Sequence, residues 1–205
     1  MASSFAKQSL SPEMFANWVV GTLGQDYSAV ASLTELAART PMSQFSHFDE
    51  TGASRMVDVG GKNVTERIAR AVAYVTLASE TLELIRNGKI LKGNVFEVAR
   101  LAGIMASKRT SDLIPLCHPL PVDRAEVNFE IVDERTLKIE SLIGVHARTG
   151  VEMEALTAVS VAALTVYDMC KSSDRGITIG PIGLVEKTGG KSGTFRRDLP
   201  GPRGV

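Results

Sequence analysis

The chain has 205 residues, of which 44% are hydrophobic and 22% charged; this composition is typical of a globular protein and excludes a wholly disordered or fibrous chain. Lys plus Arg and Asp plus Glu both total 23, so the formal net charge is +0, which argues against a protein that coats nucleic acid. The length predicts one domain with an appendage.

The two cysteines, Cys117 and Cys170, are too few for a disulfide framework and do not form a C-x-x-C pair. A reducing, cytoplasmic location fits them best. No apolar stretch is expected to reach the roughly 18 residues that a membrane helix needs, and three histidines offer little support for a metal site. We therefore expect a cytoplasmic protein with no membrane segment and no metal.

Residues 1–44 differ in composition from the rest of the chain. They are rich in Ala and Ser, and Pro12 and Pro41 interrupt them. A mitochondrial transit peptide is one interpretation, which the carboxylates of this segment disfavour. We expect residues 1–44 to be a flexible extension and residues 45–205 to form the folded domain, ending in a basic, Gly-rich tail.

The first regular patterns follow Arg55. Residues 56–59 alternate as a short strand that Gly60 and Gly61 end. Residues 67–77 are ambiguous between helix and strand, but Val72, Tyr74, Val75 and Thr76 favour a strand.

Two helices are predicted next. Ser79 is expected to cap a short helix over 80–86, which Asn87 and Gly88 end. A second helix is expected over about 95–108, because its apolar residues recur at helical spacing. Those residues are Val95, Val98, Leu101, Ala102 and Met105. Pro115 and Pro119 make residues 113–121 irregular.

The second half of the chain predicts a hairpin, a long helix and a last strand. Residues 126–132 and 136–143 alternate apolar with polar residues around a charged turn, as a hairpin does. Residues 151–171 contain no Gly or Pro and predict one uninterrupted helix, and residues 177–185 predict a strand. The pattern indicates an α+β fold, with one antiparallel sheet and helices on one face.

The segment Lys187–Gly193 resembles half of a phosphate loop. The full motif needs Gly where this chain has Val185, and it needs a following helix, which the Gly/Pro-rich sequence beyond residue 193 cannot form. Two interpretations stay open: an anion-binding nest of glycine N–H groups beside Lys187 and Lys191, and a solvated tail, which the spacing favours.

His118 follows Cys117 between two prolines. Two interpretations of His118 stay open. It could serve as a ligand or acid–base residue held on a rigid loop, or it could be a packed loop histidine without a chemical role. A Cys–His nucleophile and base are disfavoured because neighbouring side chains diverge.

Two features of the predicted helix over 151–171 bear on function, a pair of charged residues near its end and its mostly apolar surface. Asp168 and Lys171 are three residues apart and share a face, as a surface ion pair or as an acid–base set. The helix is apolar around most of its circumference, which predicts a sheet on one side and another subunit on the other. Glu154 and Asp168 lie about 21 Å apart along its axis, so either the substrate is long or the site joins two protomers.

Residues 42–193 resemble the MoaC-type cyclic pyranopterin monophosphate synthases of molybdenum cofactor biosynthesis. The segments that carry the resemblance are MVDV at 56–59, KG at 92–93 with VF at 95–96, AGI at 102–104, KRTSDLIPLCHPL at 108–120, GVEMEALTA at 150–158, YDMCK at 167–171, IGP at 179–181 and the loop KTGGKSG at 187–193. Runs this long do not agree by chance.

The resemblance implies a ferredoxin-like subunit, a homohexamer built as a trimer of dimers, and an active site at a dimer interface. It implies a lyase that converts 3′,8-cyclo-7,8-dihydro-GTP into cyclic pyranopterin monophosphate with release of pyrophosphate. The implied catalytic residues are Lys92, Asp168 and Lys171. The residues implied to line the substrate site are Leu116, Cys117, His118, Met153 and Glu154, and basic positions suited to the triphosphate are Arg67, Arg70, Lys187 and Lys191.

The implied reaction requires proton transfers at the ring and stabilisation of the charge that develops on the phosphates. We hypothesise that Asp168 positions Lys171, whose pKa is lowered by cations or burial so that it exchanges protons with the ring, and that Lys92 is a second acid or base. No cofactor motif is present, and Mg²⁺ accompanying the triphosphate is compatible with the sequence but not indicated by it. The rival interpretations are a non-catalytic nucleotide-binding oligomer and a nucleic-acid-binding protein, which the neutral charge disfavours.

Overall fold

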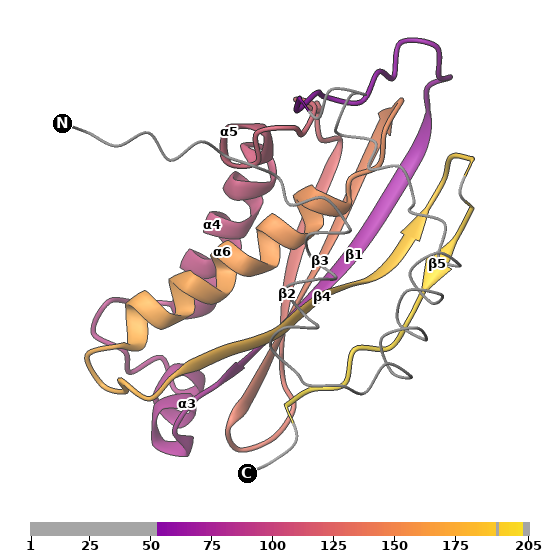
Figure 1. The fold of residues 1–205 in the computed structure, drawn as a ribbon. Helices are drawn as coiled ribbons and strands as arrows, with labels where there is room; N and C mark the ends of the chain where they lie inside the picture. Colours follow the sequence, from indigo (N-terminus) through magenta and orange to yellow (C-terminus); the bar gives the residue numbers. More distant parts are fainter. Residues whose placement is uncertain (1–52, 192, 203–205) are drawn as a thin grey trace, which may run out of the picture. The chain divides into compact units, whose positions relative to one another are not determined.

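The computed structural model describes residues 53–191 and 193–202 (Figure 1). The predicted extension over 1–44 therefore lies outside the described residues. The elements in chain order are β1 (Thr65–Thr76), α3 (Ser79–Arg86), α4 (Val95–Ser107), α5 (Thr110–Leu113), β2 (Arg124–Ile131), β3 (Thr136–Ala147), α6 (Glu152–Cys170), β4 (Thr178–Thr188) and β5 (Phe195–Arg196).

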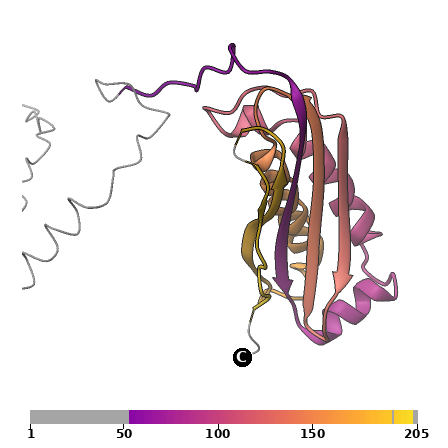
Figure 2. The same cartoon turned by 90° about the vertical axis from the view of Figure 1, so that its right-hand side faces the viewer.

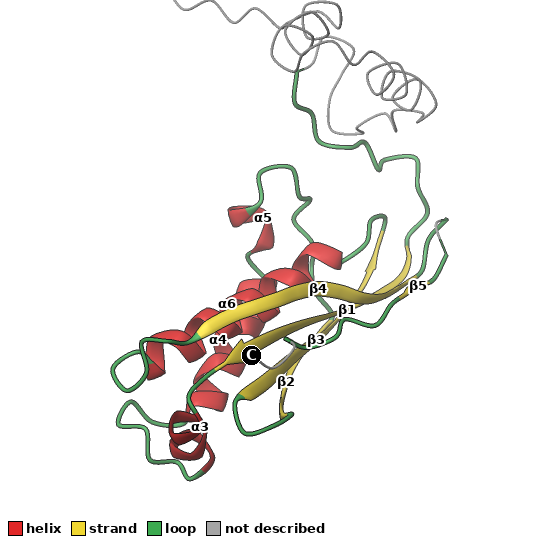
Figure 3. Cartoon of the chain, turned by 60° about the horizontal axis from the view of Figure 1, so that its bottom comes forward, coloured by secondary structure: helices red, strands yellow, loops and turns green. Residues whose placement is uncertain are grey.

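The strands form one antiparallel sheet in the order β2-β3-β1-β4-β5 (Figure 3). Helices α4 and α6 lie on the same side of this sheet (Figure 2). The order strand, helix, two strands, helix, strand, with the first strand in the middle, is the ferredoxin-like arrangement. The predicted α+β fold with helices on one face is confirmed.

Most predicted elements are present, with ends that differ by a few residues. The preference for a strand over 67–77 is confirmed by β1, the hairpin by β2 and β3, and the long helix by α6. The strand expected at 56–59 is wrong: these residues have no regular secondary structure and pair with no strand of the sheet, and Met56 is exposed. Four alternating residues cannot become a strand without a neighbouring edge to pair with.

The cap expected at Ser79 is also wrong. Ser79 is the first helical residue of α3, and Ala78 is the N-cap, whose side chain makes no capping hydrogen bond. The Ala78 N–H instead donates to the Asp174 carboxylate at 2.7 Å. The hydrogen-bonding group at the start of α3 is therefore the side chain of Asp174, which is distant in the sequence, and not the local Ser79 that the spacing suggested.

Helices α4 and α6 pack closely because small residues line their contact. Val95, Ala99, Gly103 and Ala106 of α4 are buried. The larger apolar residues that the helical pattern singled out, Val98, Leu101 and Met105, are instead exposed on the outer side of the helix. The pattern predicted the helix but not its buried face, because small residues let two backbones approach where large ones cannot.

Helix α6 is long and apolar enough to cross a membrane, with a mean hydropathy of 1.3. This differs from the expectation that no stretch reaches that length. The helix is nevertheless the core helix of this fold, because it packs against α4 and against β1, β3 and β4. Its apolarity is used in the domain core.

A Gly103→Ala substitution is expected to destabilise the domain by about 1–3 kcal/mol. A Cβ there would lie 2.8 Å from the Ala158 carbonyl oxygen and 3.1 Å from the Val127 side chain. This clash outweighs the gain of about 1 kcal/mol in helix propensity. Urea unfolding measures it, with Glu134→Gln at an exposed position of the β2–β3 turn as the control that should change little. Equal stability of Gly103→Ala and wild type would contradict the close packing.

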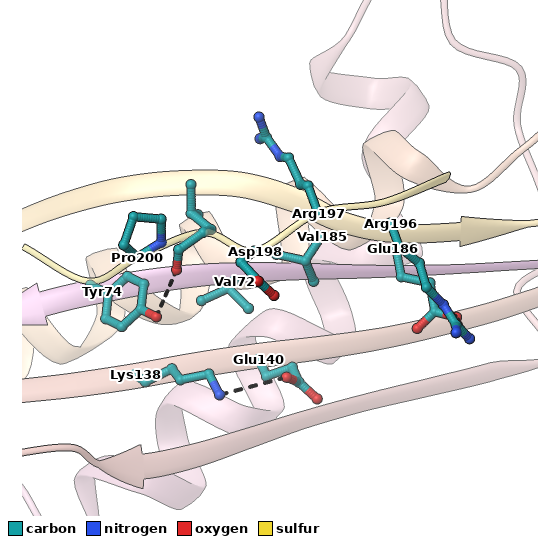
Figure 4. Close-up of a pocket in the computed structure, with 11 residues that line it drawn as sticks. Val72, Tyr74, Lys138, Glu140, Val185, Glu186, Arg196, Arg197, Asp198 and Pro200 are labelled. Atoms are coloured by element: carbon teal, nitrogen blue, oxygen red, sulfur yellow. Dashed lines mark hydrogen bonds and ion pairs between the residues drawn. The ribbon is translucent and has the colours of Figure 1, made fainter. Parts of the chain in front are cut away.

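The sheet face away from α4 and α6 carries a chain of ion pairs. Across the strands the residues alternate in charge: Glu130, Lys138, Glu140, Arg70, Glu186 and Arg196. The separations of successive pairs are 3.1, 3.9, 3.0, 3.4 and 2.8 Å. The C-terminal segment crosses the same face, where the Tyr74 hydroxyl donates to the Leu199 carbonyl oxygen at 3.0 Å (Figure 4).

Candidate active site

Lys92, Asp168 and Lys171 meet at the C-terminal end of α6; we call them the lysine cluster. Lys171 Nζ lies 2.7 Å from Asp168 Oδ1. Lys92 Nζ lies 3.2 Å from Asp168 Oδ2 and donates to the Asp168 carbonyl oxygen at 2.7 Å. All three side chains are exposed. The structure thus joins the three residues implied to be catalytic around one carboxylate, open to a ligand.

Local structure explains how the cluster forms. Asp168 and Lys171 are three residues apart at the end of α6, so their side chains share a face. Lys92 comes from the segment between α3 and α4, where Gly93 has a φ of 98° and Asn94 caps α4. The left-handed glycine turns the chain after Lys92, which directs its side chain to a residue 76 positions away.

The charges of the cluster stabilise one another. Hydrogen bonds from Lys171 and then Lys92 lower the pKa of Asp168. The hydrogen bond between Lys171 and Asp168 in turn raises the pKa of Lys171. The hypothesis of a lowered Lys171 pKa is therefore wrong for this arrangement, because a carboxylate is its nearest charged group.

A second group lies at the other end of α6, in a cavity of about 610 Å³ that we call the basic pocket. Three of the four cations suggested for the triphosphate line it: Arg67, Lys187 and Lys191. Sequence reasoning missed two further lining cations, Lys62 and Arg148. Both stand next to glycine turns, Lys62 after Gly60-Gly61 and Arg148 before Gly150, which was the available signal.

Glycines close the pocket over Arg67. Gly189 and Gly190 have φ values of 93° and 76°, and a Cβ on Gly190 would collide with the Arg67 guanidinium. Arg67 Nε is buried and has no hydrogen-bond partner within the described part of the chain. The segment after β4 thus forms a wall of a cation-lined cavity. This arrangement supports the nest interpretation over the solvated tail.

Lys187 is held in the basic pocket by the first residue of α6. Its Nζ lies 2.8 Å from Glu152 Oε1, and both side chains are about one-third exposed (31% and 29%). This pair links β4 to the start of α6. It leaves Lys187 partly neutralised, so a bound anion would compete with the Glu152 carboxylate for the same ammonium group.

Arg70 does not reach the basic pocket. It is three residues after Arg67 on β1, and side chains an odd number of positions apart point to opposite faces of a strand. Its guanidinium instead pairs with Glu140 at 3.0 Å and Glu186 at 3.4 Å. A separate cavity of about 600 Å³ on that face is lined by Lys138, Glu140, Glu186 and Arg196, among others (Figure 4), and these four side chains form two ion pairs.

The five residues implied to line the substrate site lie at the start of α6 and on the loop before β2. Met153 and Glu154 belong to the first turn of α6. Leu116, Cys117 and His118 are half-buried on the loop that follows α5. Burial, and then the charge of Glu154, raises the pKa of Cys117, which fits a close approach of the two.

Glu154 is 4% exposed, and burial followed by the charge of Glu152 raises its pKa to about 7. The folded state therefore holds a proton that the unfolded state loses between about pH 4.5 and 7. Stability should be full below this window and fall by about 3 kcal/mol as the pH rises through it.

A Glu154→Gln variant should lack this decline, since its side chain does not ionise. It is expected to match wild type at pH 4 and to unfold at a higher temperature at pH 8. Thermal unfolding at a fixed protein concentration measures this, with the exposed Glu134→Gln as control. A wild-type midpoint that stays parallel to that of Glu154→Gln across the window would contradict the raised pKa.

Within residues 53–191 and 193–202, no group of three His, Cys, Asp or Glu side chains could hold a metal ion. The charged groups of the lysine cluster and the basic pocket are ammonium, guanidinium and carboxylate groups. The lysine cluster can exchange protons with a substrate, and the basic pocket can neutralise several negative charges.

Comparison with known proteins gives consistent matches. The MoaC family matches residues 56–190. The cyclic pyranopterin monophosphate synthase of Desulfitobacterium hafniense is 57% identical over 155 residues, which are 76% of this chain and 95% of the relative. Those of Thermomicrobium roseum and Brevibacillus brevis are 57% identical over 158 residues and 54% over 154, covering 77% and 75% of this chain and 95% and 96% of theirs.

Proposed function

The chain belongs to the MoaC family, and we propose that it is a cyclic pyranopterin monophosphate synthase, a lyase of molybdenum cofactor biosynthesis. Its substrate is 3′,8-cyclo-7,8-dihydro-GTP, and its products are cyclic pyranopterin monophosphate and pyrophosphate. The observation that carries the proposal is the pairing of an acid–base cluster (Lys92, Asp168, Lys171) with a separate cavity lined by cations.

The basic pocket binds the triphosphate. When a sugar hydroxyl attacks the α-phosphorus, a new O–P bond forms and the bond to the β-phosphate oxygen breaks, so that pyrophosphate leaves. Arg67, Lys187 and Lys191 neutralise the charge that develops on that leaving group. The Arg67 Nε, which has no protein partner among the described residues, has a donor free for a phosphate oxygen.

The lysine cluster acts on the ring. Because Asp168 raises the pKa of Lys171, Lys171 enters the reaction as an ammonium acid, and Asp168 holds it in place. Lys92, on the other side of the same carboxylate, is the second proton carrier. The rearrangement has no net oxidation or reduction, so we propose no redox cofactor; Mg²⁺ carried by the triphosphate is compatible with this scheme.

The complete site is built from two subunits. Glu152, beside the basic pocket, and Asp168 stand about 24 Å apart along α6, too far for one small substrate to touch both ends. A partner placed with its α6 reversed brings its basic pocket to the lysine cluster of the first subunit. The exposed Val98, Leu101 and Met105 of α4 supply an apolar face for further assembly, which supports a homohexamer built as a trimer of dimers.

Anaerobic incubation of the purified full chain with the cyclised GTP intermediate tests the proposal. Pyrophosphate and a fluorescent pyranopterin derivative are followed together, and wild type is expected to form both in equal amounts. Binding of the intermediate without either product would favour the non-catalytic nucleotide-binding oligomer and contradict the proposed synthase.

A further inference from the structure

The loop that leaves the lysine cluster is closed by the carboxylate of Asp174. The Asp174 N–H donates to the Cys170 carbonyl oxygen at 3.0 Å, which ends α6. Asp174 Oδ1 accepts from the Gly176 N–H at 2.8 Å, within the loop itself. Its other oxygen, Oδ2, accepts from the Ala78 N–H at 2.7 Å, 96 positions away in the chain. One side chain therefore joins the end of α6 to the start of α3.

The start of α3 leads directly to the second catalytic lysine. Helix α3 is held to the core by the buried Leu82 and Ile85, and the segment after it by the buried Ile90. Backbone hydrogen bonds from Lys89 to Leu84 and from Gly93 to Ile90 keep that segment compact. Little freedom remains between the point where Asp174 holds Ala78 and the position of Lys92.

Lys92 then returns to α6 through its bonds to Asp168. The Asp174–Ala78 and Lys92–Asp168 contacts therefore close a loop of connections. The chain runs from the end of α6 to Asp174, which bonds Ala78 at the start of α3, and from α3 to Lys92, which bonds Asp168 in α6. Because Lys92 and Asp168 are both exposed, their contact is weak by itself. The half-buried contact of Asp174 with Ala78 is the one that protects this arrangement from solvent competition.

We propose that Asp174 is a positioning residue of the lysine cluster, which sets the distance between Lys92 and the Asp168–Lys171 pair without touching substrate. The proposal rests on the function proposed above. It extends the site to a residue that no spacing argument selects, since Asp174 meets Ala78 only in the folded chain.

Asp174→Ala is expected to lower kcat by roughly 10–100-fold, the loss that follows a displacement of about 1 Å at a reacting group. KM and inhibition by pyrophosphate should change less than about threefold, because neither Asp174 nor the residues it bonds line the basic pocket. Asp174→Asn keeps one of the two acceptor oxygens and should lose less activity than Asp174→Ala.

The matched control is Asp133→Ala. Asp133 makes the same kind of local bond, accepting from the Arg135 N–H at 2.8 Å, but within the β2–β3 turn. A loss of kcat as large in Asp133→Ala as in Asp174→Ala would overturn the proposal, because it would reflect general loosening of the fold. Unchanged kcat in Asp174→Ala would overturn it as well.

Amide hydrogen exchange of the intact proteins gives a readout that does not depend on turnover. In Asp174→Ala, residues 88–93 are expected to exchange faster than in wild type and in Asp133→Ala, because the segment carrying Lys92 has lost its anchor. Faster exchange confined to residues 77–79 and 174–177 would show a purely local role and overturn the proposal. A wild type without turnover would refute the synthase, while this comparison would still test Asp174.

Discussion

Lys171→Ala is expected to form pyranopterin and pyrophosphate at about 10²–10⁴ times lower kcat than wild type, which is the usual contribution of a positioned acid or base. Lys171 is the ammonium group closest to the Asp168 carboxylate, at 2.7 Å against 3.2 Å for Lys92. Its removal takes away the proton donor and leaves Asp168 with Lys92 alone. Binding of pyrophosphate should stay near the wild-type value, since the basic pocket is intact.

Single-turnover assays with the cyclised intermediate measure this loss. Lys138→Ala is the matched control, because Lys138 is also paired with carboxylates and its pKa is also raised, in this case first by Glu130, yet it lies on the opposite face of the sheet. It should keep most of its activity. Full turnover by Lys171→Ala would remove Lys171 from the chemistry and with it the role proposed for the lysine cluster.

Mixing two inactive variants is expected to restore activity. Lys171→Ala breaks the lysine cluster, and Lys187→Ala breaks the basic pocket at the other end of α6. If each site takes its cluster from one subunit and its pocket from the partner, one site of every mixed dimer is intact. Random pairing makes half of the dimers mixed, so about a quarter of wild-type activity should return.

The experiment co-expresses differently tagged variants and purifies the mixed oligomers, whose composition and mass are measured in parallel. Lys171→Ala mixed with Asp168→Asn is the control, because both changes damage the same cluster and every site stays broken. Mixed oligomers of Lys171→Ala and Lys187→Ala without activity would contradict the shared site and place the whole reaction in one subunit.

Local information was enough for most of the fold. The β-branched and aromatic residues at 72–76 predicted β1 against the helical alternative, and the unbroken apolar run at 151–171 predicted α6. The strand predicted at 56–59 was wrong because alternation of apolar and polar residues is not sufficient to form a strand. The pattern assigned the wrong buried face to α4. It counts apolar residues without regard to their size, and the contact with α6 is made by Ala and Gly.

The sequence by itself determined the family. It also proposed candidates for the catalytic residues and for most of the basic ones. The separation of Glu154 from Asp168 followed as well, because a helix converts residue spacing into distance at a constant rise. Only the tertiary structure decided which of those residues meet. It brought Lys92 to Asp168 across 76 positions, sent Arg70 to the opposite face from Arg67, and reversed the expected pKa shift of Lys171. Contacts between distant segments depend on how sheet and helices pack, and the electrostatic environment of a side chain is set by those contacts.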